Sequence, residues 1–204
     1  ADNFIKNIRK LKSTPERNKT YTLQQQLDIF KYLKSNQPIL LLFVKFISYN
    51  FLRPIEVCRL KVKDIDLKEK KLYVRAKNKV VKTKIIPDIL LKELNLEKLN
   101  PNDYLFNRDT LGGQWDAVEG SKRDYYTKQF KIVKDEFGLG KEYGLYSFRH
   151  TFITKLYHQF SKSMTPAETK GRLMLITGHS TLKALESYLR DLDAEMPEDY
   201  SKFL

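Results

Sequence analysis

Four segments of this chain carry residue types that could act on a phosphodiester. Such a group builds negative charge on its non-bridging oxygens under attack, and guanidinium groups hold those oxygens through paired hydrogen bonds. Alone, either arginine below is typical of a solvated or structural ion pair, but together Arg53 and Arg149 predict a phosphate clamp. The segments are FLRPIEVCRLKVKDID with Arg53 and Glu56, the lysine-rich KNKVV, GLYSFRHTF with Arg149, and GHSTLKALESYLR with His179 and Tyr188.

The last segment reads as an amphipathic helix with a tyrosine beside its apolar stripe. Leu182, Leu185 and Leu189 recur at helical spacing and would face a core. At about 100° per residue, Tyr188 lies roughly 90° from the centre of that stripe. On its own this is typical of a boundary tyrosine with a buried ring and a hydrated hydroxyl. A reactive phenol needs more, because ionising it at pH 7 costs roughly 4 kcal/mol, which neighbouring positive charge must offset.

The first half of the chain predicts helices followed by a hairpin. Thr22 and Gln25 form a capping box for a helix through about Lys34. Pro38 opens an apolar helix to about Asn50, and Pro54 suits the first turn of a short helix. KLYVRA and KTKIIP read as short strands on either side of the turn KNKVV.

The second half predicts mainly helix. We expect helices over ILLKELNLEKL, over about 121–137, over FRHTFITKLYHQ, and from Thr165 to Gly178. Ser147 is the predicted N-cap of the helix over FRHTFITKLYHQ. PNDYLF is a candidate strand and NRDTLGGQWDAVEG a loop. The apolar side of the helix over about 121–137 would be formed by Tyr125, Phe130 and Val133. The fold class is therefore mainly α with a small antiparallel β-sheet.

Composition narrows the class of partner. The chain has 204 residues, enough for one good core, and 38 Lys plus Arg against 25 acids give a net charge of +13. Such an excess on a folded domain is typical of a nucleic-acid binder. The lone Cys58 excludes a disulfide framework, and the three histidines show no metal-ligand spacing. No apolar run has membrane-spanning length and no signal segment is evident, so we expect no membrane association and a cytoplasmic location.

Several familiar catalytic sites are absent from the sequence. It has no glycine-rich phosphate loop, no GxSxG elbow and no HExxH motif. The acidic residues that could hold a catalytic metal show no spacing that argues for it; they are Asp64, Asp66, Asp109 and Asp116. We therefore expect phosphate to be handled by cations, with no metal and no cofactor.

The phrases LRPIEVCRLKVKDID, YSFRHTF and GHSTLKALESY, in this order, resemble the catalytic domain of the tyrosine recombinase, or phage integrase, family. The resemblance runs from about residue 20 to residue 190 and is of the mobile-element integrase type. It implies the DNA breaking-rejoining fold of that domain. It also implies three parts: a basic linker or arm at 1–20, a catalytic domain at 21–190, and an assembly tail at 191–204.

The resemblance implies a role for each residue of the set. Tyr188 would be the nucleophile, forming a covalent 3′-phosphotyrosine link to DNA. Arg53 and Arg149 would clamp the scissile phosphate, His179 would donate a hydrogen bond to it, and Glu56 would orient Arg53. Phosphodiester energy would be kept in the protein–DNA link, so that neither ATP nor metal is required.

Two features leave alternatives open. A lysine on the hairpin turn would protonate the leaving 5′-hydroxyl; counting back from Pro87 favours Lys79, and Lys77 is the alternative. The third motif usually reads H-x-x-R, but here Tyr146 takes the histidine position. A phenol does not readily accept a proton at neutral pH. Either Tyr146 only positions the phosphate, or this branch of the family relies on charge stabilisation in place of a general base. His150 is expected to be a buried structural histidine that points elsewhere on its helix.

The implied function is site-specific recombination or integration of double-stranded DNA. The resemblance implies a homotetramer on two DNA sites, an upstream DNA-binding domain in full-length members, and accessory DNA-bending proteins. A catalytic-domain fragment alone is expected to be monomeric and weakly active. A bacterial, nucleoid-associated location follows from the same resemblance. The alternatives are a type IB topoisomerase-like enzyme and a non-catalytic DNA-binding relative.

Overall fold

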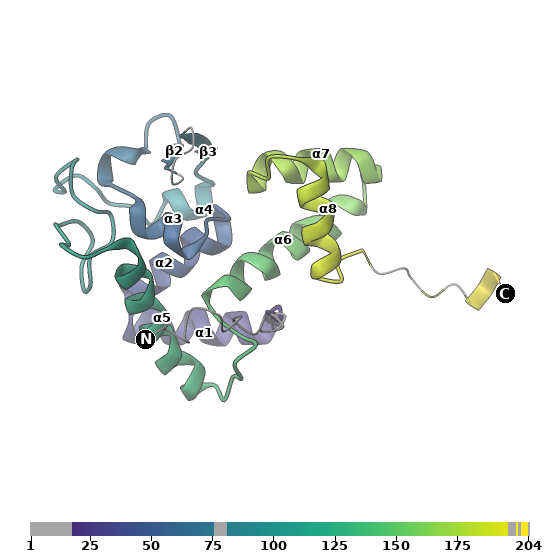
Figure 1. Cartoon of the computed structure of the whole chain (residues 1–204), viewed down its shortest axis with the longest axis horizontal. Coiled ribbons are helices and arrows are strands. Elements are labelled where there is room, and N and C mark those ends of the chain that lie inside the picture. The colour runs from purple at the N-terminus through teal and green to yellow at the C-terminus, as the bar shows by residue number, and fades with distance from the viewer. Residues whose placement is uncertain (1–17, 76–80, 196–198, 200, 204) are drawn as a thin grey trace, which may run out of the picture.

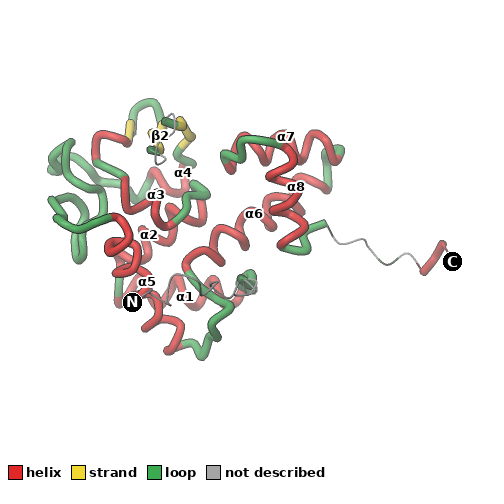
Figure 2. Tube along the Cα trace, viewed as in Figure 1, coloured by secondary structure: helices red, strands yellow, loops and turns green. Residues whose placement is uncertain are grey.

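The computed structural model describes residues 18–75, 81–195, 199 and 201–203. Helices dominate this part of the chain (Figures 1 and 2). They are α1 (Leu23–Asn36), α2 (Pro38–Tyr49), α3 (Pro54–Arg59), α4 (Asp88–Leu91), α5 (Glu119–Glu136), α6 (Leu145–Ser161), α7 (Pro166–Thr177) and α8 (Leu182–Asp191), with 3-10 turns η2 (Val62–Asp64) and η3 (Ser201–Phe203). The prediction of a mainly helical domain with a small sheet is confirmed.

The sheet is antiparallel and has the order β1 (Ile65–Asp66), β2 (Lys71–Val74), β3 (Lys82–Ile85). The two predicted strands are confirmed as β2 and β3, whereas the short β1 was not expected. Across the hairpin, Leu72 lies opposite Lys84 and Val74 lies opposite Lys82. Directly paired residues in an antiparallel ladder share a face, so both lysines lie on the face of the buried Leu72 and Val74.

Local sequence signals account for the ends of several helices. The Thr22 hydroxyl accepts from the Gln25 amide at 3.1 Å while the Gln25 side chain accepts from the Thr22 amide at 2.9 Å, which is the predicted capping box. The Thr165–Glu168 pair caps α7 in the same way. Gly178 ends α7 with a φ of +76°, a left-handed conformation that glycine adopts without penalty.

Two hydrophobic clusters hold these elements together, and α6 contributes to both. The larger cluster contains α2 almost whole and includes Phe148 of α6. The smaller one packs Ile153 of α6 against Leu173 of α7 and Leu185 and Leu189 of α8. Figure 1 shows α6 crossing from the main body to the α7–α8 unit. The helix that carries Arg149 therefore joins the two halves of the molecule.

Three local predictions were wrong. The helix expected over ILLKELNLEKL stops at Leu91, and the Asn95 side chain then accepts the Glu97 amide, which competes with helical bonding. PNDYLF contributes two isolated bridges and no strand; Tyr104 pairs with Lys61 and Phe106 pairs with Leu111. α6 begins before Ser147, whose hydroxyl accepts the Gly144 amide from within the first turn.

The apolar side of α5 is also shifted from the prediction, because Tyr126 is buried and Tyr125 is only half-buried. The predicted arm at 1–20 falls outside the described residues up to 17, so it stays a prediction. The predicted division into 21–190 and 191–204 likewise stays a prediction.

Candidate active site

Arg53 lies at the turn between α2 and α3, where it is the N-cap of α3. Its amide donates to the Glu56 carboxylate at 2.7 Å, and its Nη1 pairs with the other carboxylate oxygen at 3.1 Å. The nearby Phe51 adopts a left-handed φ of 54°, which is costly for a bulky residue. Its buried ring packs in the smaller cluster with Leu185 and Leu189 of α8. The turn that carries Arg53 is thus tied to the helix that carries Tyr188.

Arg149 is a buried cation in α6, with only 1% of its surface exposed. Its Nη2 donates to the Thr177 carbonyl at 3.4 Å, whereas Nε and Nη1 have no hydrogen-bond partner within the described residues. Buried charges are normally paired and hydrogen-bonded, so these unpaired N–H groups call for a reason. Their chemistry fits an anion such as a phosphate oxygen.

His179 lies directly after the C-terminus of α7 and contacts Thr177. The Thr177 hydroxyl lies 2.8 Å from the Leu173 carbonyl and 2.6 Å from His179 Nδ1. Because a carbonyl can only accept, the hydroxyl donates to Leu173 and accepts from Nδ1–H. The neutral ring then has no proton on Nε2, and Nε2 becomes a donor when the ring is protonated. Burial and the charges of Arg149 and Arg53 lower the pKa of His179 to about 4, so the free protein holds it neutral near pH 7.

Tyr188 lies beside His179, with ring centroids 5.1 Å apart. Its hydroxyl is buried and makes no hydrogen bond within the described residues. Burial raises the pKa of Tyr188 above its ordinary value, and the nearby charges of Arg149 and Arg53 oppose that rise. The phenol therefore lies near cations, and its buried hydroxyl differs from the hydrated hydroxyl that the boundary interpretation requires.

The two aromatic residues of the third motif also contact this site. The His150 ring stacks on Tyr188 at 5.2 Å between centroids and meets the Tyr146 ring edge-on at 4.6 Å. The expectation that His150 is buried is correct, but the expectation that it points elsewhere is wrong, because α8 packs across this part of α6. Its face-to-face stacking suits it to hold the Tyr188 ring. Burial and Arg149 lower its pKa to about 4.

Tyr146 also lies near Arg53. Partial burial lowers the pKa of Arg53, but Glu56 and Tyr146 raise it by a larger amount, so the net shift is upward. Arg53 therefore stays a cation beside the Tyr146 phenol.

Lys84 is a residue of this site that sequence reasoning missed. Its Nζ donates to the Ile176 carbonyl at 2.8 Å. Burial, followed by the charge of Arg149, lowers the pKa of Lys84 to about 7, and Glu56 opposes that shift. The available signal was the hairpin register, which puts Lys84 opposite the buried Leu72.

The structure thus brings together the set Arg53, Glu56, Tyr146, Arg149, His179 and Tyr188. The two turn lysines, Lys77 and Lys79, lie outside the described residues. Two cations, a neutral imidazole and a phenol at one place can bind a phosphate and attack it.

In the described part of the chain, no cluster of three or more His, Cys, Asp or Glu side chains is arranged to hold a metal ion. The helices described here are also too short or too polar to cross a lipid bilayer.

Comparison with known proteins agrees with this geometry. A family model described as the phage integrase family matches residues 19–195. No curated protein sequence matches the chain.

Solved structures share the fold at low sequence identity. A XerA recombinase is 20% identical, with a TM-score of 0.60 over 94% of this chain and 68% of that one. A Tn1549 transposon integrase, in complex with transposon right end DNA, is 15% identical, with a TM-score of 0.63 over 91% of this chain and 67% of that one. A lambda integrase dimer bound to a COC′ core site is 17% identical, with a TM-score of 0.63 over 93% of this chain and 52% of that one. This chain therefore spans about two thirds of the first two proteins and half of the third.

Proposed function

Because the chain belongs to the phage integrase family, we propose that it is the catalytic domain of a site-specific DNA recombinase or integrase. The observation that carries the proposal is the burial of a guanidinium with two unpaired nitrogens near a buried phenol whose hydroxyl is also unpaired in the described part of the chain. Arg149 Nε and Nη1 and the Tyr188 hydroxyl all lack hydrogen-bond partners within the described residues. A phosphodiester would supply acceptor oxygens for the N–H groups of Arg149 and for the phenolic O–H. Its phosphorus would also be the electrophile that the phenolic oxygen attacks.

The proposed reaction is a reversible transesterification. The Tyr188 oxygen attacks phosphorus and loses its proton to water, and the bond from phosphorus to the 5′-oxygen breaks. The departing oxygen takes up a proton and becomes a 5′-hydroxyl, leaving the 3′-phosphate on the tyrosine. A 5′-hydroxyl from a partner strand then reverses these steps and restores both the phosphodiester and the free phenol.

The arginines would supply most of the electrostatic stabilisation. Arg149 and Arg53 approach from α6 and from the start of α3, so they could hold two different non-bridging oxygens. Removing one such donor typically costs on the order of 3 kcal/mol in the transition state. Glu56 orients the Arg53 guanidinium through the ion pair already present.

His179 would donate to the phosphate from Nε2, which requires the imidazolium form because Nδ1–H is already given to Thr177. A bound phosphodiester anion favours that form, since a nearby negative charge raises the pKa of an imidazole. Tyr146, next to Arg53, would position the phosphate and would not act as a base. The proton donor to the 5′-oxygen is proposed to be Lys79, with Lys77 as the alternative.

The proposed partner is double-stranded DNA. The net charge of +13 would attract it and make binding fall steeply with salt. We further propose four protomers on two DNA sites, with residues 191–204 contacting a neighbour, and accessory DNA-bending proteins for the complete reaction.

The test is covalent trapping on a pool of duplexes with randomised sequence around a single nick. Cleavage just before the nick releases a short fragment that carries the 5′-hydroxyl. The reverse reaction then has no nucleophile, so the enzyme stays covalently attached to the DNA. We expect a protein–DNA adduct with the wild-type chain and none with Tyr188→Phe. DNA binding without any adduct would favour the non-catalytic relative. Relaxation of supercoiled plasmid by a monomer, without site preference, would favour the topoisomerase alternative.

A further inference from the structure

β3 places Lys84 and Lys82 on the face of the sheet that carries the buried Leu72 and Val74, although Lys82 itself remains exposed. Its exposed positions include Ile85, which is 77% exposed, while Lys84 is largely covered. A strand with one buried face normally turns its apolar residues inward, and here the pattern is reversed. Such a departure from the local rule is expected where function requires it.

Both lysines bind the end of α7. Lys84 Nζ donates to the Ile176 carbonyl at 2.8 Å, and Lys82 Nζ donates to the Gly178 carbonyl at 2.7 Å. The carbonyl between them, that of Thr177, accepts from Arg149. Three consecutive carbonyls are thus each bound by a cation, at the helix end where backbone carbonyls lack helical partners and the dipole is negative.

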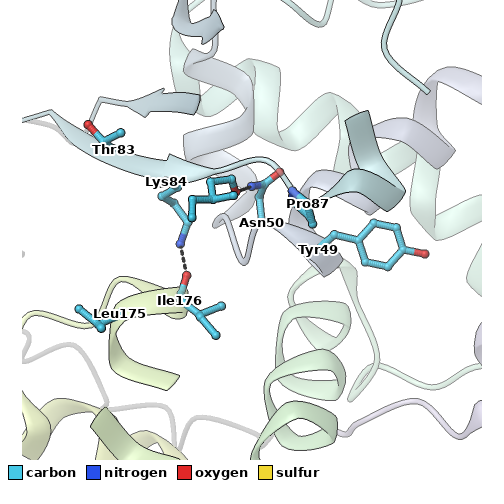
Figure 3. Close-up of a pocket in the computed structure, with 8 residues that line it drawn as sticks. Tyr49, Asn50, Thr83, Lys84, Pro87, Leu175 and Ile176 are labelled. Carbon is cyan, nitrogen blue, oxygen red and sulfur yellow. Dashed lines mark hydrogen bonds between the residues drawn. The ribbon is translucent and has the colours of Figure 1, made fainter. Parts of the chain in front are cut away.

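Little else joins β3 to α7. Figure 3 shows Lys84 reaching across a pocket to Ile176, with Leu175 beside it and Asn50 and Pro87 on the opposite wall. The pocket has a volume of about 440 Å³, and Leu175, which lines it, is 80% exposed. Lys84 also closes on the turn itself, because a Cβ at Gly178 would lie 3.5 Å from its Nζ. The lysine–carbonyl bonds therefore span a gap that side-chain packing does not fill.

Holding Lys84 in this place is electrostatically unfavourable. Burial, together with repulsion from Arg149, Lys82 and Arg53, lowers the pKa of Lys84 to about 7, and attraction to Glu56 opposes that shift. An apolar residue opposite Leu72 would avoid that cost.

We propose that Lys84, assisted by Lys82, is a positioning residue that fixes the 176–178 turn so that Arg149 and His179 meet one phosphate. The inference rests on the proposed function, because it assigns these lysines to the same site. Arg149 comes from α6, His179 follows the turn, and Arg53 belongs to the half of the molecule that contains the sheet. α6 itself packs on α2 through Phe148, next to Arg149. The lysines bind the turn to the same half of the molecule, so they set the position of His179 relative to Arg53 and Arg149.

The experiment compares Lys84→Met, Lys84→Arg and Lys82→Met with a control, Lys68→Met, at an exposed lysine of the β1–β2 turn. The rate of adduct formation is measured in single turnover at saturating nicked duplex, and the DNA dissociation constant is measured separately. For Lys84→Met we expect the rate to fall roughly 10- to 100-fold, the size of loss that misplacing reacting groups produces. We expect the dissociation constant to change less than about threefold, because Lys84 is bound to a carbonyl and not to a phosphate. Lys84→Arg should recover part of the rate and Lys82→Met should lose less of it.

A substrate with sulfur in place of the bridging 5′-oxygen separates positioning from proton donation. A thiolate leaves without a proton, so this substrate restores variants that lack the general acid. Lys84→Met should stay slow on it. Full rescue would make Lys84 the proton donor and overturn the positioning role, as would a wild-type rate or a faster rate on the ordinary substrate.

A second readout needs no catalysis. Nitrogen-15 spectra of the histidine rings report the Nδ1 contact of His179 in the free protein. We expect the His179 signals to move in Lys84→Met and to stay in place in Lys68→Met, with thermal unfolding confirming that both are folded. Unmoved His179 signals in Lys84→Met would refute the inference, whether or not the wild-type chain forms an adduct. Absence of an adduct with the wild-type chain would instead count against the proposed function.

Discussion

Tyr188→Phe should stabilise the free protein while abolishing covalent attachment to DNA. The Tyr188 hydroxyl is buried and makes no hydrogen bond of normal geometry within the described residues, although the Arg149 guanidinium lies close enough to lower its pKa by its charge and by a weak contact. A buried polar group without a partner costs about 1–3 kcal/mol, and part of any gain is lost to the small void that the oxygen leaves. We therefore expect the free energy of unfolding to rise by about 1 kcal/mol. In a chain of this length that corresponds to roughly 2–4 °C in Tm.

Tyr21→Phe is the matched control. The Tyr21 ring is also buried, but its hydroxyl donates to the Gly144 carbonyl at 3.1 Å. Removing it should lower the free energy of unfolding by about 1 kcal/mol, so the two variants should differ by about 2 kcal/mol. Urea denaturation at pH 7 measures both. If Tyr188→Phe loses as much stability as Tyr21→Phe, the hydroxyl is satisfied in the free protein and the argument from an unpaired phenol fails.

Three further outcomes follow from the same geometry. Arg149→Lys keeps the charge but loses the planar fork, so the single-turnover rate of adduct formation should fall on the order of 100-fold while DNA affinity changes little. The pKa of His150 is about 4 in the fold against an ordinary value of 6.5, so the folded state binds fewer protons than the unfolded chain across that window. The contribution of His150 to stability should therefore fall as pH drops from 6.5 to 4, by up to about 3 kcal/mol, and His179, whose pKa is also about 4, adds to the fall. His150→Phe should flatten this fall in urea titrations at pH 7 and 4.5. Gly178→Ala should cost about 1 kcal/mol because of its φ of +76°, and should slow adduct formation by moving the turn; an unchanged Tm would argue against that conformation.

The elements that the sequence predicted are those with local causes. The capping residues Thr22 and Thr165 act on amides three residues away, so a single segment contains the whole signal. The order of the three motifs identified the family in the same way. Arg53 and Glu56 illustrate the point within the site, because their contact is one helical turn long.

What the sequence missed depends on how distant elements cross. Lys84 reads as a solvated lysine until the hairpin register places it opposite Leu72 and the end of α7 supplies a carbonyl. His150 points away from the predicted site on a helical wheel, and it meets Tyr188 only because α8 packs on α6. Burial of the Tyr188 hydroxyl has the same origin.

The site as a whole is half covered, and this constrains how DNA enters it. Arg53 has a side chain 50% exposed, whereas Arg149 is 1% exposed beneath the residues around it. A phosphate can therefore reach Arg53 first and can reach Arg149 only when a covering group moves. The Arg149 nitrogens and the Tyr188 hydroxyl are both buried, on α6 and on α8. The two groups that the proposed reaction brings to one phosphate are therefore the ones that solvent reaches least, whereas Arg53 offers the exposed first contact.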